Sequence, residues 1–302
     1  MKKGYLLVIS TAIISGLSIF INKFGVSVIN PYIFTYLKNL TVAFLLTGLI
    51  LAFKDWKAFK KLTRKQWFLL ITIGLIGGSI PFLLFFKGLS LSNPAQASFL
   101  HKTMFVYVAV LAALFLKEKI DKRFILGGLI LLFGNLILLK KFPIEINQGD
   151  LLILLATLLW AAENTISKSL LKDLAGRIVA WGRMLFGSLF IFLFLLGTNQ
   201  VTPITSLNLK QISWVFVTAI LLFGYVITWY SGLKFVPVSQ ATAILLLGSP
   251  ITTLLSLIFE KIITFQELLS GILIILGIII VIGFKEILKL LKEVKRIIYV
   301  RT

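Results

Sequence analysis

Ten long apolar stretches recur along this chain, and they constrain its fold more than any other feature. A segment needs about 20 residues of helix to cross a bilayer core, and backbone polar groups inside hydrocarbon must bond to one another. The short alternating segments of a membrane β-barrel are absent from the sequence. Hydrophobic residues make up 59% of the 302, against about 45–50% in a soluble domain. The sequence therefore predicts an all-α integral membrane protein.

Prolines, glycines and asparagines separate the apolar stretches into ten predicted transmembrane helices. The predicted spans are residues 4–22, 31–53, 66–87, 93–116, 122–140, 149–171, 176–197, 211–233, 238–259 and 265–284. The connections between them are short, apart from the basic stretch 54–65. No segment is long or polar enough to form a separate soluble domain.

The second half of the chain repeats the first. A shift of 145 positions places Gly4 on Gly149 and Lys23 on Lys168 without a gap. Because each copy holds five spans, an odd number, the second copy must enter the membrane in the opposite orientation. Paired inverted repeats are typical of secondary transporters. The predicted units are residues 1–142 and 143–284, followed by a basic amphipathic tail, 285–302.

The distribution of basic residues predicts the orientation of the chain. If both termini are cytoplasmic, 22 of the 31 Lys and Arg residues lie on the cytoplasmic side, six on the other side and three within spans. Such a bias favours this topology, in a plasma membrane. The net charge of +20 then faces anionic lipid headgroups. We therefore expect membrane lipids as partners and no nucleic acid.

Four segments carry a family resemblance: residues 14–25 (ISGLSIFINKFG), 114–119 (LFLKEK), 159–168 (LWAAENTISK) and 258–261 (IFEK). They resemble the EamA-type ten-helix branch of the drug/metabolite transporter superfamily. The resemblance implies two inverted five-helix repeats around a central cavity, and export of amino acids or other small metabolites. The chain departs from the family pattern at Ser15, where a Trp is usual, and near Val106, where a Pro is usual.

Charged side chains inside the spans are the main candidates for a working site, because each costs about 2.5–3.5 kcal/mol on insertion scales. Lys102 is expected to attract an anionic group of the substrate. Glu163 is expected to couple protons or to pair with Lys102; the alternative is a structural ion pair with Lys168 or Arg183. His101, the only histidine, is a candidate proton carrier, or a neutral ring bonded between helices.

The remaining candidates have weaker signals. Lys38 and Arg183 occupy equivalent positions in the two repeats, which favours a structural or gating role over substrate contact. Aromatic and amide side chains are expected to shape a cavity or to bind substrate: Trp160, Tyr225, Trp229, Gln96 and Gln240. The two amides could instead join helices. Prolines within spans, Pro81 and Pro250, are expected to kink them and to play a structural or gating part.

Enzyme and metal signatures are missing from the sequence. It has no cysteine, a single histidine and no phosphate-binding loop, so we expect no enzyme, no cofactor and no metal site. We predict a secondary transporter, an exporter of small polar metabolites such as amino acids, driven by protons or by a substrate gradient. The alternatives are an amphiphile or lipid-carrier translocase, and a non-transporting membrane scaffold or intramembrane enzyme. The oligomeric state stays open.

Overall fold

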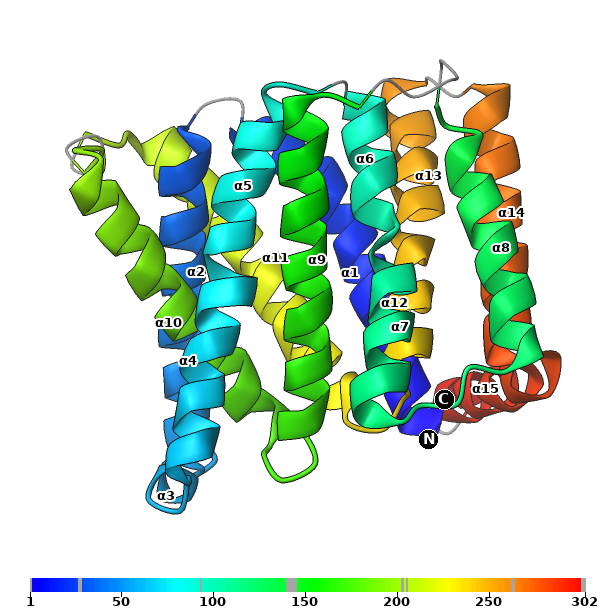
Figure 1. Cartoon of the computed structure of the whole chain (residues 1–302), viewed down its shortest axis with the longest axis horizontal. Helices are drawn as coiled ribbons and strands as arrows, with labels where there is room; N and C mark the ends of the chain where they lie inside the picture. The colour runs from blue at the N-terminus through cyan, green and yellow to red at the C-terminus, as the bar shows by residue number, and fades with distance from the viewer. Residues whose placement is uncertain are drawn as a thin grey trace.

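The computed structural model describes residues 2–26, 29–92, 94–139, 146–201, 204, 206–261 and 264–299. Every regular element in these ranges is a helix, and the helices stand side by side in one bundle (Figure 1). Nine helical segments in the described part of the chain are long and apolar enough to cross a membrane. An all-α, multi-pass membrane fold is therefore confirmed.

The helices follow the predicted spans closely. The first half contains α1 (Lys2–Val26), α2 (Pro31–Ala52), α3 (Trp56–Phe59), α4 (Arg64–Gly78), α5 (Ile80–Leu89), α6 (Pro94–Lys102), α7 (Met104–Leu116) and α8 (Lys122–Leu136). The second half contains α9 (Gln148–Leu170), α10 (Gly176–Gly197), α11 (Leu209–Leu233), α12 (Val238–Ile244), the 3₁₀ turn η2 (Leu245–Leu247), α13 (Gly248–Glu260), α14 (Phe265–Ile282) and α15 (Phe284–Tyr299).

Three of the spans are interrupted. The third is broken at Ser79, two residues before Pro81, and the ninth passes through η2 just before Pro250, as the prolines predict. The fourth is broken at Thr103, where the sequence offers no proline. Thr103 and Leu247 are equivalent at a shift of 144 positions, so the fourth and ninth spans share this interruption.

Helix α8 has 15 residues, and it is the one predicted span outside the nine. At 1.5 Å per residue it is about 22 Å long, shorter than a hydrocarbon core of about 30 Å. It packs closely against α14: a Cβ placed on Gly127 would lie 2.7 Å from the carbonyl oxygen of Gly277. A count of ten spans, with α8 as the fifth, stays a prediction.

The first helices of the two halves run in opposite directions. The start of α1 and the end of α9 meet at the same turn between α11 and α12. There Gly4 packs against Val236, and Lys168 Nζ donates to the carbonyl oxygens of Leu233 and Val236 at 2.6 and 2.7 Å. An antiparallel pair of first helices is what an inverted repeat requires.

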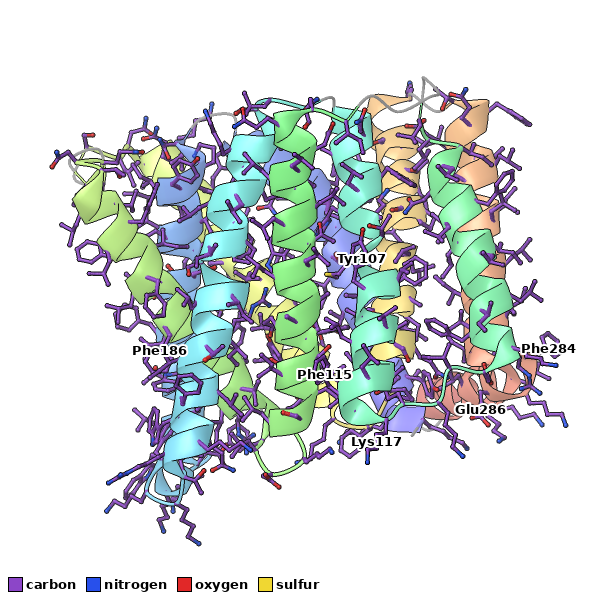
Figure 2. All side chains as sticks on the ribbon, viewed as in Figure 1. Tyr107, Phe115, Lys117, Phe186, Phe284 and Glu286 are labelled. Atoms are coloured by element: carbon purple, nitrogen blue, oxygen red, sulfur yellow. The ribbon has the colours of Figure 1, made fainter. Side chains whose placement is uncertain are left out.

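One end of the bundle, here called the terminal face, holds the start of α1 and the whole of α15 (Figure 1). Helix α15 lies across the bundle axis beside the end of α14 and the start of α1, and its Leu290 is buried. Lys117 and Glu286 also lie at this face, and nitrogen-bearing side chains crowd around α3 (Figure 2). Cytoplasmic placement of the terminal face stays a prediction, made from the charge bias.

Candidate functional site

The break before Pro81 leaves backbone carbonyl groups without their helical partners. Proline has no N–H, so the carbonyl of Gly77, four residues earlier, has no donor within the helix. The N–H of Phe82 bonds to Ser79 instead of to Gly78. Two carbonyl oxygens in the middle of the third span, those of Gly77 and Gly78, are therefore open to donors from other helices.

Three side chains from other helices bond to these two carbonyls. Trp160 Nε1 on α9 and Arg183 Nη2 on α10 both donate to the oxygen of Gly77, at 3.1 and 3.2 Å. Asn39 Nδ2 on α2 donates to the oxygen of Gly78 at 3.0 Å. The broken third span thus becomes a meeting point for three neighbouring helices.

Glu163 lies against this meeting point and is 1% exposed. Its carboxylate accepts from the hydroxyls of Ser167 and Tyr230, at 2.6 and 2.7 Å. A Cβ on Gly77 would stand only 2.2 Å from Glu163 Cγ, so the missing side chain makes room for the acid. We call the set Gly77, Trp160, Glu163, Ser167, Arg183 and Tyr230 the Glu163 cluster.

The two charged side chains of the Glu163 cluster, Arg183 and Glu163, are not in direct contact as an ion pair. Arg183 interacts electrostatically with Glu163, Tyr225 and Tyr230. No ion pair within 4.0 Å joins Arg183 to Glu163 in the described chain, and Arg183 Nε is buried without a hydrogen-bond partner there. Lys168 bonds to backbone at the terminal face, and Lys102 is not a partner of Glu163. The acid is held by neutral hydroxyl groups.

The ring of His101 is connected to this cluster through Trp160. Its centroid lies 5.0 Å from the ring of Trp160 and 5.3 Å from that of Phe85. The imidazole is half-buried and makes no hydrogen bond within the ranges that the structure describes. Two predicted candidates, His101 and Trp160, therefore contact each other directly.

Lys102, the next residue, lines a separate cavity of about 220 Å³ between the two halves of the chain. The first half contributes α1 and α6, and the second half contributes α13 and α14. Lys102 Nζ has neither a hydrogen bond nor an ion pair among the described residues. The polar lining residues, which define the Lys102 cavity, are Ser98, Lys102, Ser249, Thr252, Thr253, Glu267 and Ser270, and Pro250 lies among them.

The aromatic candidates of α11 serve helix packing beside the Glu163 cluster. Trp229 Nε1 donates to Asn164 Oδ1 at 3.2 Å, and the side chain is fully buried. Tyr225 stacks against Trp229 with the ring planes 22° apart. Neither of the two lines the Lys102 cavity.

Gln96 and Gln240 connect the two halves at opposite ends of the bundle. Gln240 accepts from the hydroxyl of Tyr5 at the terminal face. Gln96 Nε2 donates to Asp150 Oδ2 at 2.7 Å at the opposite face. Tyr5 and Asp150 are themselves equivalent at a shift of 145 positions. We call these two bonds the end contacts.

Lys38 and Arg183 differ in the structure although they are equivalent in sequence. Arg183 points inward to the Glu163 cluster. Lys38 Nζ donates to Asn22 Oδ1 at 3.5 Å and lies 5.0 Å from the centre of the Phe34 ring. Of the two, only the arginine belongs to a polar cluster shared by several helices.

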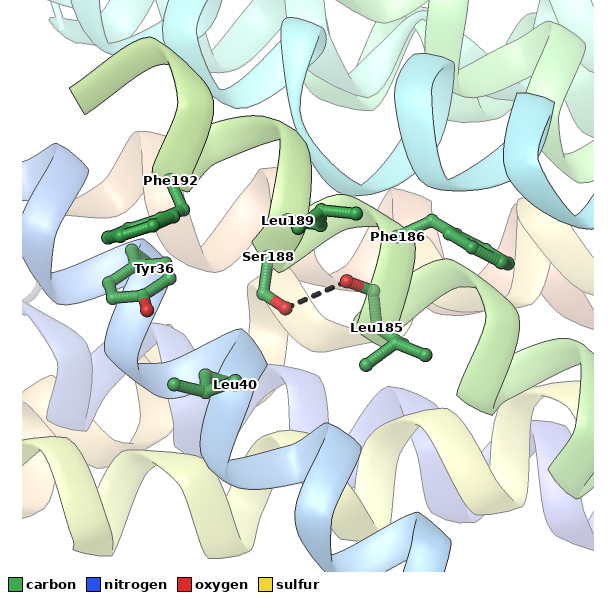
Figure 3. Close-up of a pocket in the computed structure, with 7 residues that line it drawn as sticks. All are labelled: Tyr36, Leu40, Leu185, Phe186, Ser188, Leu189 and Phe192. Carbon is green, nitrogen blue, oxygen red and sulfur yellow. Dashed lines mark hydrogen bonds between the residues drawn. The ribbon is translucent and has the colours of Figure 1, made fainter. Parts of the chain in front are cut away.

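A second hollow is apolar and lies between α2 and α10 (Figure 3). Its volume is about 210 Å³. The hydroxyl of Ser188, on its wall, donates to the carbonyl oxygen of Leu185. Tyr36 stacks on Phe192 at one end, and Leu189 on its wall is 49% exposed. This hollow, the α2–α10 groove, holds none of the predicted binding residues.

Sequence reasoning missed several members of these sites. Ser167 and Tyr230 carry no signal by type, because hydroxyl side chains are common in membrane helices. Asp150 could have been found, since it stands at the position of Tyr5 in the second copy. Gly77 could have been found as well, because it lies four residues before Pro81.

Known proteins similar to this chain are transporters by name. A sequence model described as the EamA-like transporter family matches residues 2–140 and again 147–283. The uncharacterized transporter YyaM of Bacillus subtilis is 25% identical over 230 residues, covering 72% of this chain and 74% of that protein. The riboflavin transporter ImpX of Fusobacterium nucleatum is 26% identical over 211 residues, covering 66% and 70%.

A solved crystal structure shares the fold. It superposes with a TM-score of 0.74 over 92% of this chain and 95% of its own, at 17% sequence identity.

Proposed function

Because the chain belongs to the EamA-like transporter family, we propose that it is a secondary transporter of small polar metabolites such as amino acids. It works as an exporter in the plasma membrane, by alternating access between two inverted repeats. Membrane proteins of this kind rock one repeat against the other around a site near the midplane. The end contacts support this mechanism, since each joins the two halves at one face and would have to break for that face to open.

The Lys102 cavity is the observation that carries the proposal. It lies between the halves, it contains an ammonium group that has no partner among the described residues, and hydroxyl groups surround it. Small-molecule pockets commonly measure about 300–1,000 Å³, so a cavity of about 220 Å³ favours a small solute. A buried cation without a partner costs free energy, and a carboxylate or another anionic group of the substrate would offset that cost.

Energy coupling is assigned to Glu163 and His101. Glu163 is a buried acid in the middle of α9, and its bonds to Ser167 and Tyr230 hold the carboxylate in place. A change in its charge would alter the balance with Arg183 and so the packing of α4, α9, α10 and α11. The His101 ring contacts Trp160 of the same cluster, and Lys102 is the next residue. Protonation within the cluster can therefore act on Lys102 through Trp160 and His101.

An amphiphile or lipid-carrier translocase is the rival within the family. Such a protein would need a cavity that opens sideways to lipid. The α2–α10 groove faces outward and is apolar, but the Lys102 cavity shares no lining residue with it. A polar solute is therefore the better match to the unpaired lysine.

The proposal is tested with two variants in proteoliposomes, after a thermal-shift screen against amino acids, organic acids, nucleosides and riboflavin. Lys102→Met should weaken ligand binding by roughly 10–100-fold, because a hydrogen bond to a charged group contributes about 1.5–3 kcal/mol. Glu163→Gln should keep binding and lose accumulation driven by a pH gradient. Lys57→Met, in the basic stretch outside the spans, is the matched control and should transport as the wild type does.

The outcomes separate the parts of the proposal. Transport that persists at the wild-type level in both variants would show that the site is assigned wrongly. Purified protein that moves no solute in either direction would favour the non-transporting scaffold.

A further inference from the structure

Asn135 on α8 is an unsatisfied polar side chain inside the bundle. It is 0% exposed, and neither Oδ1 nor Nδ2 has a hydrogen-bond partner in the described part of the chain. Buried polar side chains are bonded in the large majority of cases, so each exception requires an explanation. No other side chain in these ranges has both of its amide atoms buried and unpartnered.

The position of Asn135 places it behind the wall of the Lys102 cavity. Leu138, three residues after Asn135 in the turn that follows α8, lines that cavity. Two turns earlier, Gly128 abuts a ring atom of Phe105 on the antiparallel helix α7. Seven residues along α8 from Gly128 lead to Asn135, about 10 Å along the axis. Seven residues back from Phe105, past the break at Thr103, lead to Ser98 on α6, which contacts α8. Asn135 therefore lies at the height of Ser98, which also lines the cavity.

We propose that Asn135 is a solute-contacting residue of the transport pathway, which reaches the Lys102 cavity in a conformation other than this one. In that conformation its amide would bond to a solute group that can both donate and accept hydrogen bonds. This inference rests on the proposed alternating-access function, and it adds a specificity-determining residue that the sequence did not indicate.

The cost of the unpaired amide is what connects it to the conformational change. An unsatisfied amide destabilises the conformation that buries it and favours any conformation that pairs it. A purely structural asparagine would bond to a neighbouring helix. Asn39 does so through Nδ2, which donates to the Gly78 carbonyl oxygen at 3.0 Å. Asn39 thus shows how a buried asparagine is bonded in this fold, and Asn135 has no such bond in the described part of the chain.

Accessibility to a water-soluble thiol reagent tests the proposal directly, because the natural chain has no cysteine. Asn135→Cys is compared with Ser98→Cys, on the cavity wall, and with Leu131→Cys, which is 0% exposed one turn earlier on α8. The reagent is a small charged methanethiosulfonate, added to the full-length protein in proteoliposomes. A residue exposed only in a minor conformation reacts in proportion to the population of that conformation.

We expect Asn135→Cys to react more slowly than Ser98→Cys and at least about tenfold faster than Leu131→Cys, as a minor conformation would allow. A labelling rate equal to that of Leu131→Cys would overturn the proposal. Each variant is also labelled after denaturation, which shows that its thiol is intact.

Thermal unfolding supplies an independent readout. Asn135→Leu should raise the melting temperature, since it removes an unpaired amide from this conformation, and it should slow transport. Asn39→Leu should lower the melting temperature, since it leaves the Gly78 carbonyl without a partner. A fall in both variants would contradict the proposal. If the wild-type protein transports no solute but Asn135→Cys still reacts, the transport function is overturned, while the accessibility of Asn135 is upheld.

Discussion

At the residue scale, one proline and one glycine organise the Glu163 cluster. Pro81 removes the helical donor to the Gly77 carbonyl, and that carbonyl then accepts from Trp160 and Arg183. The absent side chain of Gly77 leaves the space that Glu163 fills. The carbonyl and the vacant Cβ position of the same residue thus serve three side chains on two other helices.

Gly77→Ala is predicted to destabilise the protein by about 1–3 kcal/mol, the usual cost of forcing extra atoms into a packed interior. Its Cβ would lie 2.2 Å from Glu163 Cγ, so the acid would have to move away from Tyr230. Gly48→Ala is the matched control: no atom from another part of the described chain lies within 4 Å of that Cβ, and alanine in a helix should add roughly 0.5–1 kcal/mol. Thermal unfolding in detergent measures both, and equal melting temperatures would refute the steric argument.

At the element scale, hydrogen bonds at helix ends hold the two halves together at each face. The equivalent positions Tyr5 and Asp150 bond to the equivalent amides Gln240 and Gln96. The Tyr5 phenol donates at the terminal face, and the Asp150 carboxylate accepts at the other, where the Ser92 hydroxyl is a second donor to Asp150, at 2.7 Å. The terminal face is also joined through a carboxylate: Glu118 accepts from the N–H of Val238 at 2.7 Å and from the N–H and hydroxyl of Ser239 at 3.2 and 2.8 Å.

Gln96→Ala is predicted to open the opposite face. It removes a hydrogen bond to a carboxylate, about 1.5–3 kcal/mol, which should speed labelling of Ser98→Cys from that face by about tenfold or more. Gln240→Ala removes one of the contacts at the terminal face and should leave this rate unchanged or lower it. Equal acceleration by both variants would show that the end contacts do not control separate faces.

At the scale of the whole molecule, two matched halves form one bundle. The family model matches each half in turn, α1 and α9 run antiparallel, and the start of α1 lies at the same face as α15 (Figure 1). Because α10 crosses the bundle between α9 and α11, the turn that follows it lies at the opposite face. The charge bias predicts that the terminal face is cytoplasmic.

Single cysteines test this topology. Lys57→Cys, in α3 at the terminal face, should be labelled by an impermeant thiol reagent only from the cytoplasmic side. Asn199→Cys, in the turn after α10, should be labelled only from outside. Inverted membrane vesicles and intact cells provide the two sides, and labelling of both positions from one side would contradict the inverted arrangement.

The helices and their order could be read from the sequence, because segment length and local hydrophobicity decide which stretches cross a bilayer. The breaks before Pro81 and Pro250 were also predictable from the local sequence, because proline has no N–H to donate within a helix. The interruption at Thr103 was not, since neither a proline nor a glycine marks it. Lys102 and Glu163 could be singled out by the cost of their charge, but not the groups that surround them.

Those surroundings depend on which helices touch, over separations that no local pattern encodes. Trp160 bonds to a carbonyl 83 residues away, Tyr230 to an acid 67 residues away and Gln96 to a carboxylate 54 residues away. The duplication suggests Lys38 and Arg183 as equals, yet packing turns only Arg183 toward the Glu163 cluster. Hydrophobicity is a property of each segment, so the sequence determines the spans and their repeat. Hydrogen bonding between helices is a property of pairs of helices. The tertiary structure therefore decides which polar groups bond to each other and which, like Asn135 in the described part of the chain, have no partner.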